Sequence, residues 1–222
     1  MLRVNQTILV ASLCIIGFTG GVLVTQVSQE HWNEVKLAFN RSDYLYQSQN
    51  HQWLKRVELE AIRSLGWHDL LPESERSLLQ HYQNQTELPF EQQFSLALEA
   101  STDENYKAAL YSINIVEALL DKPVSISGFI VPVETDEDRA ILSFFLVPYY
   151  GACIHYPPPP PNQMLYAQLE TGFHLETINQ AYTLTGRLTR GPFEDPLGTS
   201  AYLIEVATIK PFQQQPDDFR QH

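Results

Sequence analysis

Residues 124–131 of the chain, VSISGFIV, decide the fold class. Apolar and polar side chains alternate over residues 124–127, and the apolar run continues past Gly128, which is the two-residue period of a half-buried strand. A glycine inside such a run indicates a bend or a close approach of another backbone segment. The stretch therefore predicts the first strand of a β domain.

Four more strand-like runs follow this one. They cover residues 141–147, 164–169, 181–189 and 202–209, with turn-forming residues between them. Five short strands with a glycine in the first favour a small five-stranded OB-like barrel over residues 121–212, and a compact sandwich is the alternative. Residues 213–222 would follow as a flexible tail. The predicted fold is thus mainly β with a helical region before it.

Residues 30–120 are predicted to be that helical region, acting as a spacer or a docking surface. Three apolar stripes follow the helical period: Leu54, Val57, Ala61 and Leu65, with Gly66 as the end of the helix; Leu78, Leu79 and Tyr82; and Phe90, Phe94, Ala97 and Leu98. Leucine and aromatic stripes of this kind are normally packing surface. We therefore expect all three to be buried against neighbouring elements.

The N-terminus predicts where the protein works. Residues 8–24 (ILVASLCIIGFTGGVLV) carry no charge and would span about 25 Å as a helix, at the short end of a membrane-crossing length. Arg3 precedes them and Glu30 follows, so the positive-inside rule leaves the start in the cytoplasm and the bulk in the periplasm. We predict an anchor over residues 1–28 of a single-pass inner-membrane protein. A cleaved secretory signal is the alternative.

The charge balance restricts the partners. The chain has 14 Lys and Arg against 26 Asp and Glu, a formal net charge of −12. Phosphate backbones are bound chiefly through Lys and Arg, so nucleic acid is excluded as a partner even though OB-like barrels often bind it. Of the two cysteines, Cys14 lies in the apolar segment, which leaves Cys153 as a single exported thiol.

Residues 148–163, PYYGACIHYPPPPPNQ, carry the most distinctive chemistry. In an extended segment Cys153 and His155 are two positions apart and point the same way. A thiolate and an imidazole are half of a tetrahedral zinc site, or a soft site for copper, and His174 is the candidate third ligand. The same pair could instead be an activated thiol.

The five consecutive prolines in this segment predict a rigid polyproline II rod without backbone donors. Such a rod beside aromatic side chains is a common recognition surface. The predicted binding residues are Tyr150, Tyr156, Pro157, Pro159, Pro161, Asn162 and Gln163.

Several of these motifs together resemble a known family. Residues 128–133 (GFIVPV), residues 145–155 (FLVPYYGACIH), the five prolines and the Asn-Gln pair resemble the bacterial domain-of-unknown-function family numbered 3299. The upstream WHDLLP of residues 67–72 is similar to a motif that precedes the domain in its members, so the match covers roughly residues 65–211. The resemblance implies an exported or lipid-anchored envelope protein, often associated with transporter components and with a suggested link to metal uptake. It implies no established activity.

Three functional hypotheses remain open. The leading one is a membrane-anchored periplasmic module that binds zinc through Cys153 and His155 and serves an inner-membrane protein or transporter component. The second is an interaction scaffold of the envelope with no ligand. The third is a thiol-dependent enzyme using Cys153 with His155.

Overall fold

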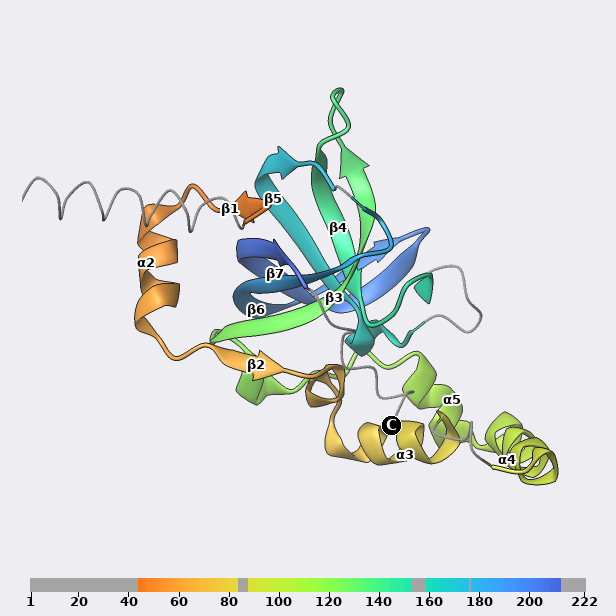
Figure 1. The fold of residues 1–222 in the computed structure, drawn as a ribbon. Helices are drawn as coiled ribbons and strands as arrows, with labels where there is room; N and C mark the ends of the chain where they lie inside the picture. The colour runs from red at the N-terminus through yellow and green to blue at the C-terminus, as the bar shows by residue number, and fades with distance from the viewer. Residues whose placement is uncertain (1–43, 84–87, 153–158, 176, 213–222) are drawn as a thin grey trace, which may run out of the picture. The chain divides into compact units, whose positions relative to one another are not determined.

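The computed structural model describes residues 44–83, 88–152, 159–175 and 177–212 (Figure 1). The predicted anchor at residues 1–28 and the predicted tail at residues 213–222 lie outside these ranges. Within them, no helix is long and apolar enough to cross a membrane.

Five strands close into a barrel. They are β3 (Pro123–Thr135), β4 (Ile141–Val147), β5 (Leu165–Phe173), β6 (Ala181–Asp195) and β7 (Gly198–Pro211). The pairing runs β3–β4–β5–β7–β6 and returns to β3, with β5 and β7 parallel and the other pairs antiparallel. This ring confirms the predicted five-stranded barrel.

The side-chain period of the strands explains the core. In β3, Val124, Ile126 and Ile130 point into the barrel and are buried, whereas the serines between them are half-buried. In β4, Phe144 and Leu146 join the barrel core, and the alternate residues Phe145 and Val147 belong to a second apolar cluster. Strand β4 is therefore buried on both faces, which accounts for its almost continuous apolar sequence.

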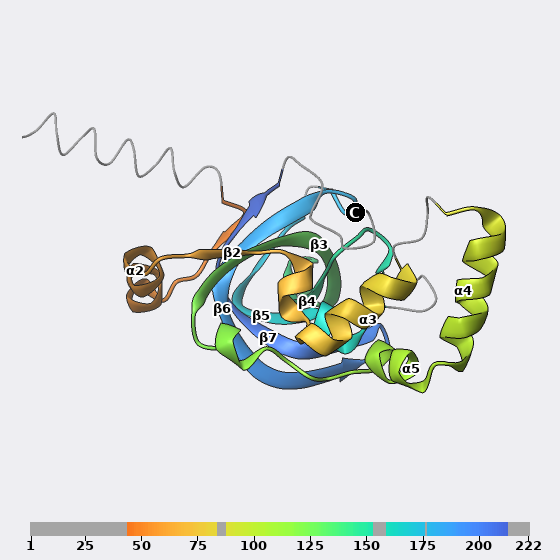
Figure 2. The same cartoon turned by 90° about the horizontal axis from the view of Figure 1, so that it is seen from below.

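Helices and short strands lie before and beside the barrel. The helices are α2 (His51–Leu59), α3 (Glu73–Gln83), α4 (Phe90–Thr102) and α5 (Glu104–Leu110), with short 3-10 turns η1 (Trp67–Leu70), η2 (Glu117–Leu119) and η4 (Pro161–Gln163). Strand β1 (Tyr46–Gln47) pairs with β7, and β2 (Arg63–Leu65) pairs with β3. Figure 2 shows α3 near one end of the barrel and α4 farther out.

The prediction of one helix through residues 54–65 is wrong at its C-terminal half. Helix α2 ends at Leu59, and residues 63–65 form β2, which runs parallel to β3. Leu65 is buried in the barrel core. Its apolar side chain fits a helical stripe and a strand equally well, and pairing with a strand distant in sequence decides between them.

Candidate functional site

The segment of residues 148–163, which has the most distinctive sequence, begins beside a buried apolar cluster. It leaves β4 after Val147, and Ala152 is fully buried in the cluster with Phe145 and Met164. Tyr150 is 55% exposed, with its ring centre 6.1 Å from that of Phe129. Tyr150 is thus available at the surface, and its role in binding stays a prediction.

The far end of the segment is also fixed, but three of the predicted binding residues there, Pro159, Asn162 and Gln163, are buried. Pro159 is buried, and Pro161 begins η4. Asn162 and Gln163 are both fully buried. The Asn162 side chain donates to a Glu75 carboxylate oxygen (2.7 Å) and to the Asn114 carbonyl (3.0 Å). Their burial gives Asn162 and Gln163 a structural role, because a fully buried amide cannot contact a partner at the surface.

A buried carboxylate joins three parts of the chain. Glu75, in the first turn of α3, accepts hydrogen bonds from the Ser112 hydroxyl, the Asn114 amide and the Asn162 amide, each at 2.7 Å. The predictions from sequence did not include this role of Glu75, although the sequence carried a signal for it. Glu75 falls in line with the apolar stripe of α3 at Leu79, so it is a charge on the packing face.

A second junction packs Trp67, which lies between α2 and α3, against the barrel. Trp67 is buried, and its indole Nε1 donates to the Ser127 carbonyl (2.8 Å) while its own carbonyl accepts from the Gln163 amide (2.8 Å). A side chain on Gly128 would place its Cβ 2.7 Å from the Trp67 ring and 2.6 Å from the Val147 carbonyl oxygen. The glycine in the first strand is therefore required by the close approach of the indole and the neighbouring strand.

Tyr202 completes this junction from β7. Its hydroxyl donates to the Leu70 carbonyl (2.8 Å) and accepts from the Val116 N–H (2.7 Å). Burial raises the pKa of Tyr202 to about 12, and the negative charge of Glu75 adds to the shift. The hydroxyl therefore stays protonated and keeps both bonds at any ordinary pH.

The predicted metal ligands are only partly described. Cys153 and His155, with the predicted binding residues Tyr156 and Pro157, lie outside the described residues. His174 is exposed and follows the last residue of β5, whereas η4 precedes the first residue of that strand. Among the described residues no group of three or more His, Cys, Asp or Glu side chains could hold a metal ion. The zinc site stays a prediction.

Helix α4 does not pack as predicted. None of its residues is buried, and Phe90, Phe94 and Leu98 are 80%, 63% and 60% exposed. These positions are four residues apart, so the side chains form one apolar stripe along the helix. The half-buried residues Leu96 and Ala100 lie on its other side. The expectation of a buried stripe is wrong for α4, because the described residues offer no surface that covers it.

Comparison with known proteins identifies the family of this chain. A family model described as "Protein of unknown function (DUF3299)" matches residues 67–211. A crystal structure of a DUF3299 family protein from Pseudomonas aeruginosa PAO1 is similar at 30% sequence identity and a TM-score of 0.50, covering 69% of this chain and 98% of that chain. No curated protein matches the chain significantly. The matched region includes the barrel, Trp67 and the Asn-Gln pair of η4, and the chain belongs to the DUF3299 family of proteins of unknown function.

Proposed function

We propose that this chain is an accessory module of the bacterial envelope that docks an inner-membrane partner protein, such as a transporter component, through α4. Residues 8–24 would anchor it, with the bulk of the chain in the periplasm. The observation that carries the proposal is the exposure of Phe90, Phe94 and Leu98 in one stripe. An amphipathic helix that presents anchors four residues apart fits an apolar groove on a partner protein.

The charges of α4 favour a protein groove over a lipid surface. The helix carries Glu91 and Glu99 and no Lys or Arg. Helices that lie on membranes combine their apolar face with basic residues that attract anionic lipids. A chain of net charge −12 would be repelled by such lipids, so an apolar groove with a basic rim is the better match.

The test is co-purification with the partner from detergent-solubilised envelopes. The protein should bring down a membrane protein in near-stoichiometric amount, and the double variant Phe90→Ser, Phe94→Ser should lose it. Ile178→Ser is the matched control, because Ile178 is 58% exposed in the loop between β5 and β6. A partner retained by the double variant, or no partner for the unaltered protein, would contradict the proposal.

A second candidate function is zinc binding by Cys153 and His155, with zinc preferred over copper. It is favoured by the fixed ends of their segment, since Ala152 and Pro159 are both buried. Ligands presented from a rigid base lose less entropy when they bind. His174, directly after the last residue of β5, is the candidate third ligand.

Metal analysis of the full-length protein tests this second candidate. Near-stoichiometric zinc should be present, should disappear in Cys153→Ser and should remain in Cys14→Ser, the matched control. Binding should weaken in acid, because thiolate and neutral imidazole are the required forms. A protein that takes up no added zinc would contradict it. Fast alkylation of Cys153 in metal-free protein would instead support the thiol-enzyme hypothesis.

A further inference from the structure

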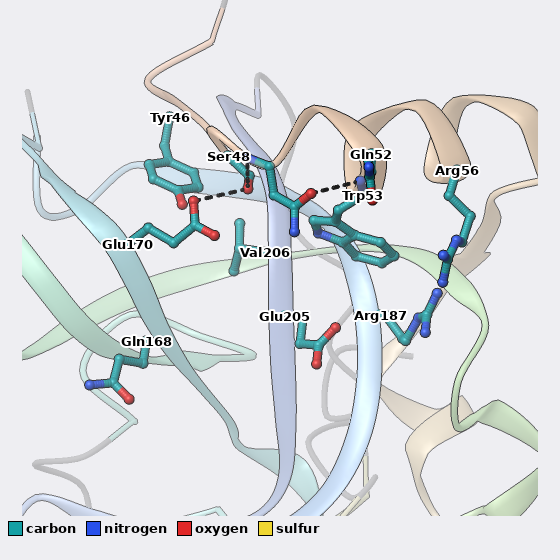
Figure 3. A pocket seen from close by; sticks show the side chains of 11 residues that line it. Tyr46, Ser48, Gln52, Trp53, Arg56, Gln168, Glu170, Arg187, Glu205 and Val206 are labelled. Carbon is teal, nitrogen blue, oxygen red and sulfur yellow. Dashed lines mark hydrogen bonds between the residues drawn. The ribbon is translucent and has the colours of Figure 1, made fainter.

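A cleft of about 420 Å³ opens beside the barrel (Figure 3). One wall is α2 with Trp53 and Arg56. The strands contribute Glu170 from β5, Arg187 from β6 and Glu205 from β7. Its volume lies at the lower end of the range for small-molecule sites, roughly 300–1,000 Å³.

Two guanidinium groups face each other in this cleft. The Arg187 guanidinium carbon lies 4.7 Å from the centre of the Trp53 ring, which holds it in place. Its Nε is buried without a hydrogen-bond partner among the described residues. Figure 3 shows the Arg56 head group pointing toward that of Arg187. Two positive charges that line one cleft repel each other, and an anion bound between them offsets this repulsion.

The packing of α2, β6 and β7 fixes the position of Arg187. Leu54 and Val57 hold α2 against Ala207 of β7. A Cβ on Gly186 would lie 2.3 Å from the Glu205 carbonyl oxygen, so only glycine allows β6 and β7 to approach this closely. Arg187 follows this glycine. The position of the arginine thus depends on the same contacts that fix α2 and the two strands.

Acidic side chains line the rest of the cleft. Glu205 is the cross-strand neighbour of Arg187 in the pairing of β6 with β7. The Glu170 carboxylate is held by the Ser48 hydroxyl (3.4 Å) and the Gln49 N–H (3.2 Å). Burial raises the pKa of Tyr46 beside it, so that phenol stays neutral. Arg56 and Arg187 thus give the cleft a cationic end, Glu170 gives it an anionic end, and Glu205 lies between them (Figure 3).

We propose that this cleft binds a small zwitterion of the amino-acid or dipeptide class. The ligand carboxylate lies between Arg56 and Arg187, and the ammonium group faces Glu205. The planar fork of an arginine matches the two oxygens of a carboxylate. The acidic end repels a polyanion and accepts a cation, which selects for a ligand that carries both charges.

Calorimetric titration of the full-length protein in a non-ionic detergent tests the proposal, with alanyl-alanine as the probe. Alanyl-alanine amide lacks the carboxylate, N-acetyl-alanyl-alanine lacks the ammonium group, and inorganic phosphate is an anion alone. The amide should bind about tenfold or more weakly than alanyl-alanine, and Arg187→Gln should weaken the binding of alanyl-alanine by a similar factor. Each change removes a charge-assisted hydrogen bond. N-acetyl-alanyl-alanine should bind several-fold more weakly than alanyl-alanine, and Glu205→Gln should weaken the binding of alanyl-alanine several-fold.

The matched control is Arg190→Gln, on the same strand, whose guanidinium pairs with Glu117 outside the cleft. This variant should bind like the unaltered protein. If Arg187→Gln does not fold, Arg56→Gln on the exposed side of α2 replaces it. The proposal is overturned if alanyl-alanine does not bind at millimolar concentration, if the amide binds equally well, if phosphate binds as tightly, or if Arg190→Gln weakens binding as much as Arg187→Gln.

Discussion

The barrel and the three helices α3, α4 and α5, which we call the helical arm, are built in opposite ways. The barrel core holds large, fully buried side chains such as Phe144, Leu146 and Leu165. The apolar core of the arm is small: Leu79 and Ala109 pack with Leu71, which precedes α3, and with partly buried neighbours. Since apolar burial contributes roughly 25 cal/mol per Å², the free energy of unfolding resides mainly in the barrel.

Polar contacts stabilise the arm, whereas apolar burial stabilises the barrel. Tyr82 of α3 donates to Asp103 (2.9 Å), and Glu75 binds the chain segments on either side. Meanwhile α4 leaves its largest apolar side chains in water. The arm is thus held in place by few, directional contacts, and α4 leaves its apolar stripe exposed.

The largest effect is expected at the junction of the two regions. Trp67→Ala should lower the free energy of unfolding by about 3–5 kcal/mol, because it removes a fully buried indole and leaves a cavity against Gly128. Phe94→Ala removes a ring of similar size from the arm and should change stability by less than about 0.5 kcal/mol. Urea unfolding followed by circular dichroism measures both. Equal losses would mean that α4 is as well packed as the barrel.

The next largest effect should detach the arm while leaving the barrel folded. Glu75→Ala removes the acceptor of three hydrogen bonds and should cost about 2–4 kcal/mol. Glu73→Ala, two residues earlier on the exposed side of α3, is the matched control and should be nearly neutral. Amide hydrogen exchange should speed up in α3 and α5 of the Glu75 variant. Unchanged exchange there would show that the carboxylate does not hold the arm.

Alkaline titration tests the link between the two regions, because Tyr202 of the barrel bonds to Leu70 and Val116, which lie before and after the arm. Its pKa is raised from 10 to about 12 in the folded state, so its stabilising contribution is complete below pH 10 and is lost as the pH rises toward 12. Tyr202→Phe should be less stable at neutral pH, since the Leu70 carbonyl and the Val116 N–H lose their partner. It should also lose less stability than the unaltered protein between pH 10 and 12. An identical decline in both proteins would contradict the assignment.

Local patterns predicted the barrel well because strand periodicity is a local property. The alternation of residues 124–131 and the apolar run at residues 141–147 correspond to β3 and β4, and the number of strands sufficed to predict closure. Strand β2 escaped prediction because Leu65 fits either period and pairs with Ile126, which is distant in sequence. Only the long-range contact decides its conformation.

The candidate site was less predictable, for a related reason. Asn162 and Gln163 are polar residues beside prolines, which is typical of surface, and their burial depends on Glu75 and on the Trp67 carbonyl, 87 and 96 residues away. The apolar stripe of α4 has the same pattern whether it faces a core or a partner. Periodicity identifies such a face but not what covers it.

The smallest expected effect lies in the arm alone. Asp103 ends α4 and caps α5, accepting from the N–H groups of Asn105 and Tyr106. These bonds, with that of Tyr82, hold the pKa of Asp103 below its ordinary value of 3.8, so its contribution is present above that pH and is lost as the pH falls through the lowered pKa. Asp103→Ala should speed amide exchange in α5 at neutral pH, and Asp103→Asn should do so less, because asparagine still caps a helix. Barrel amides should exchange at their original rates in both variants, since the arm depends on this cap and the barrel does not. Faster exchange throughout the barrel would mean that the two regions unfold together, and the contrast between a buried barrel and a tethered arm would fail.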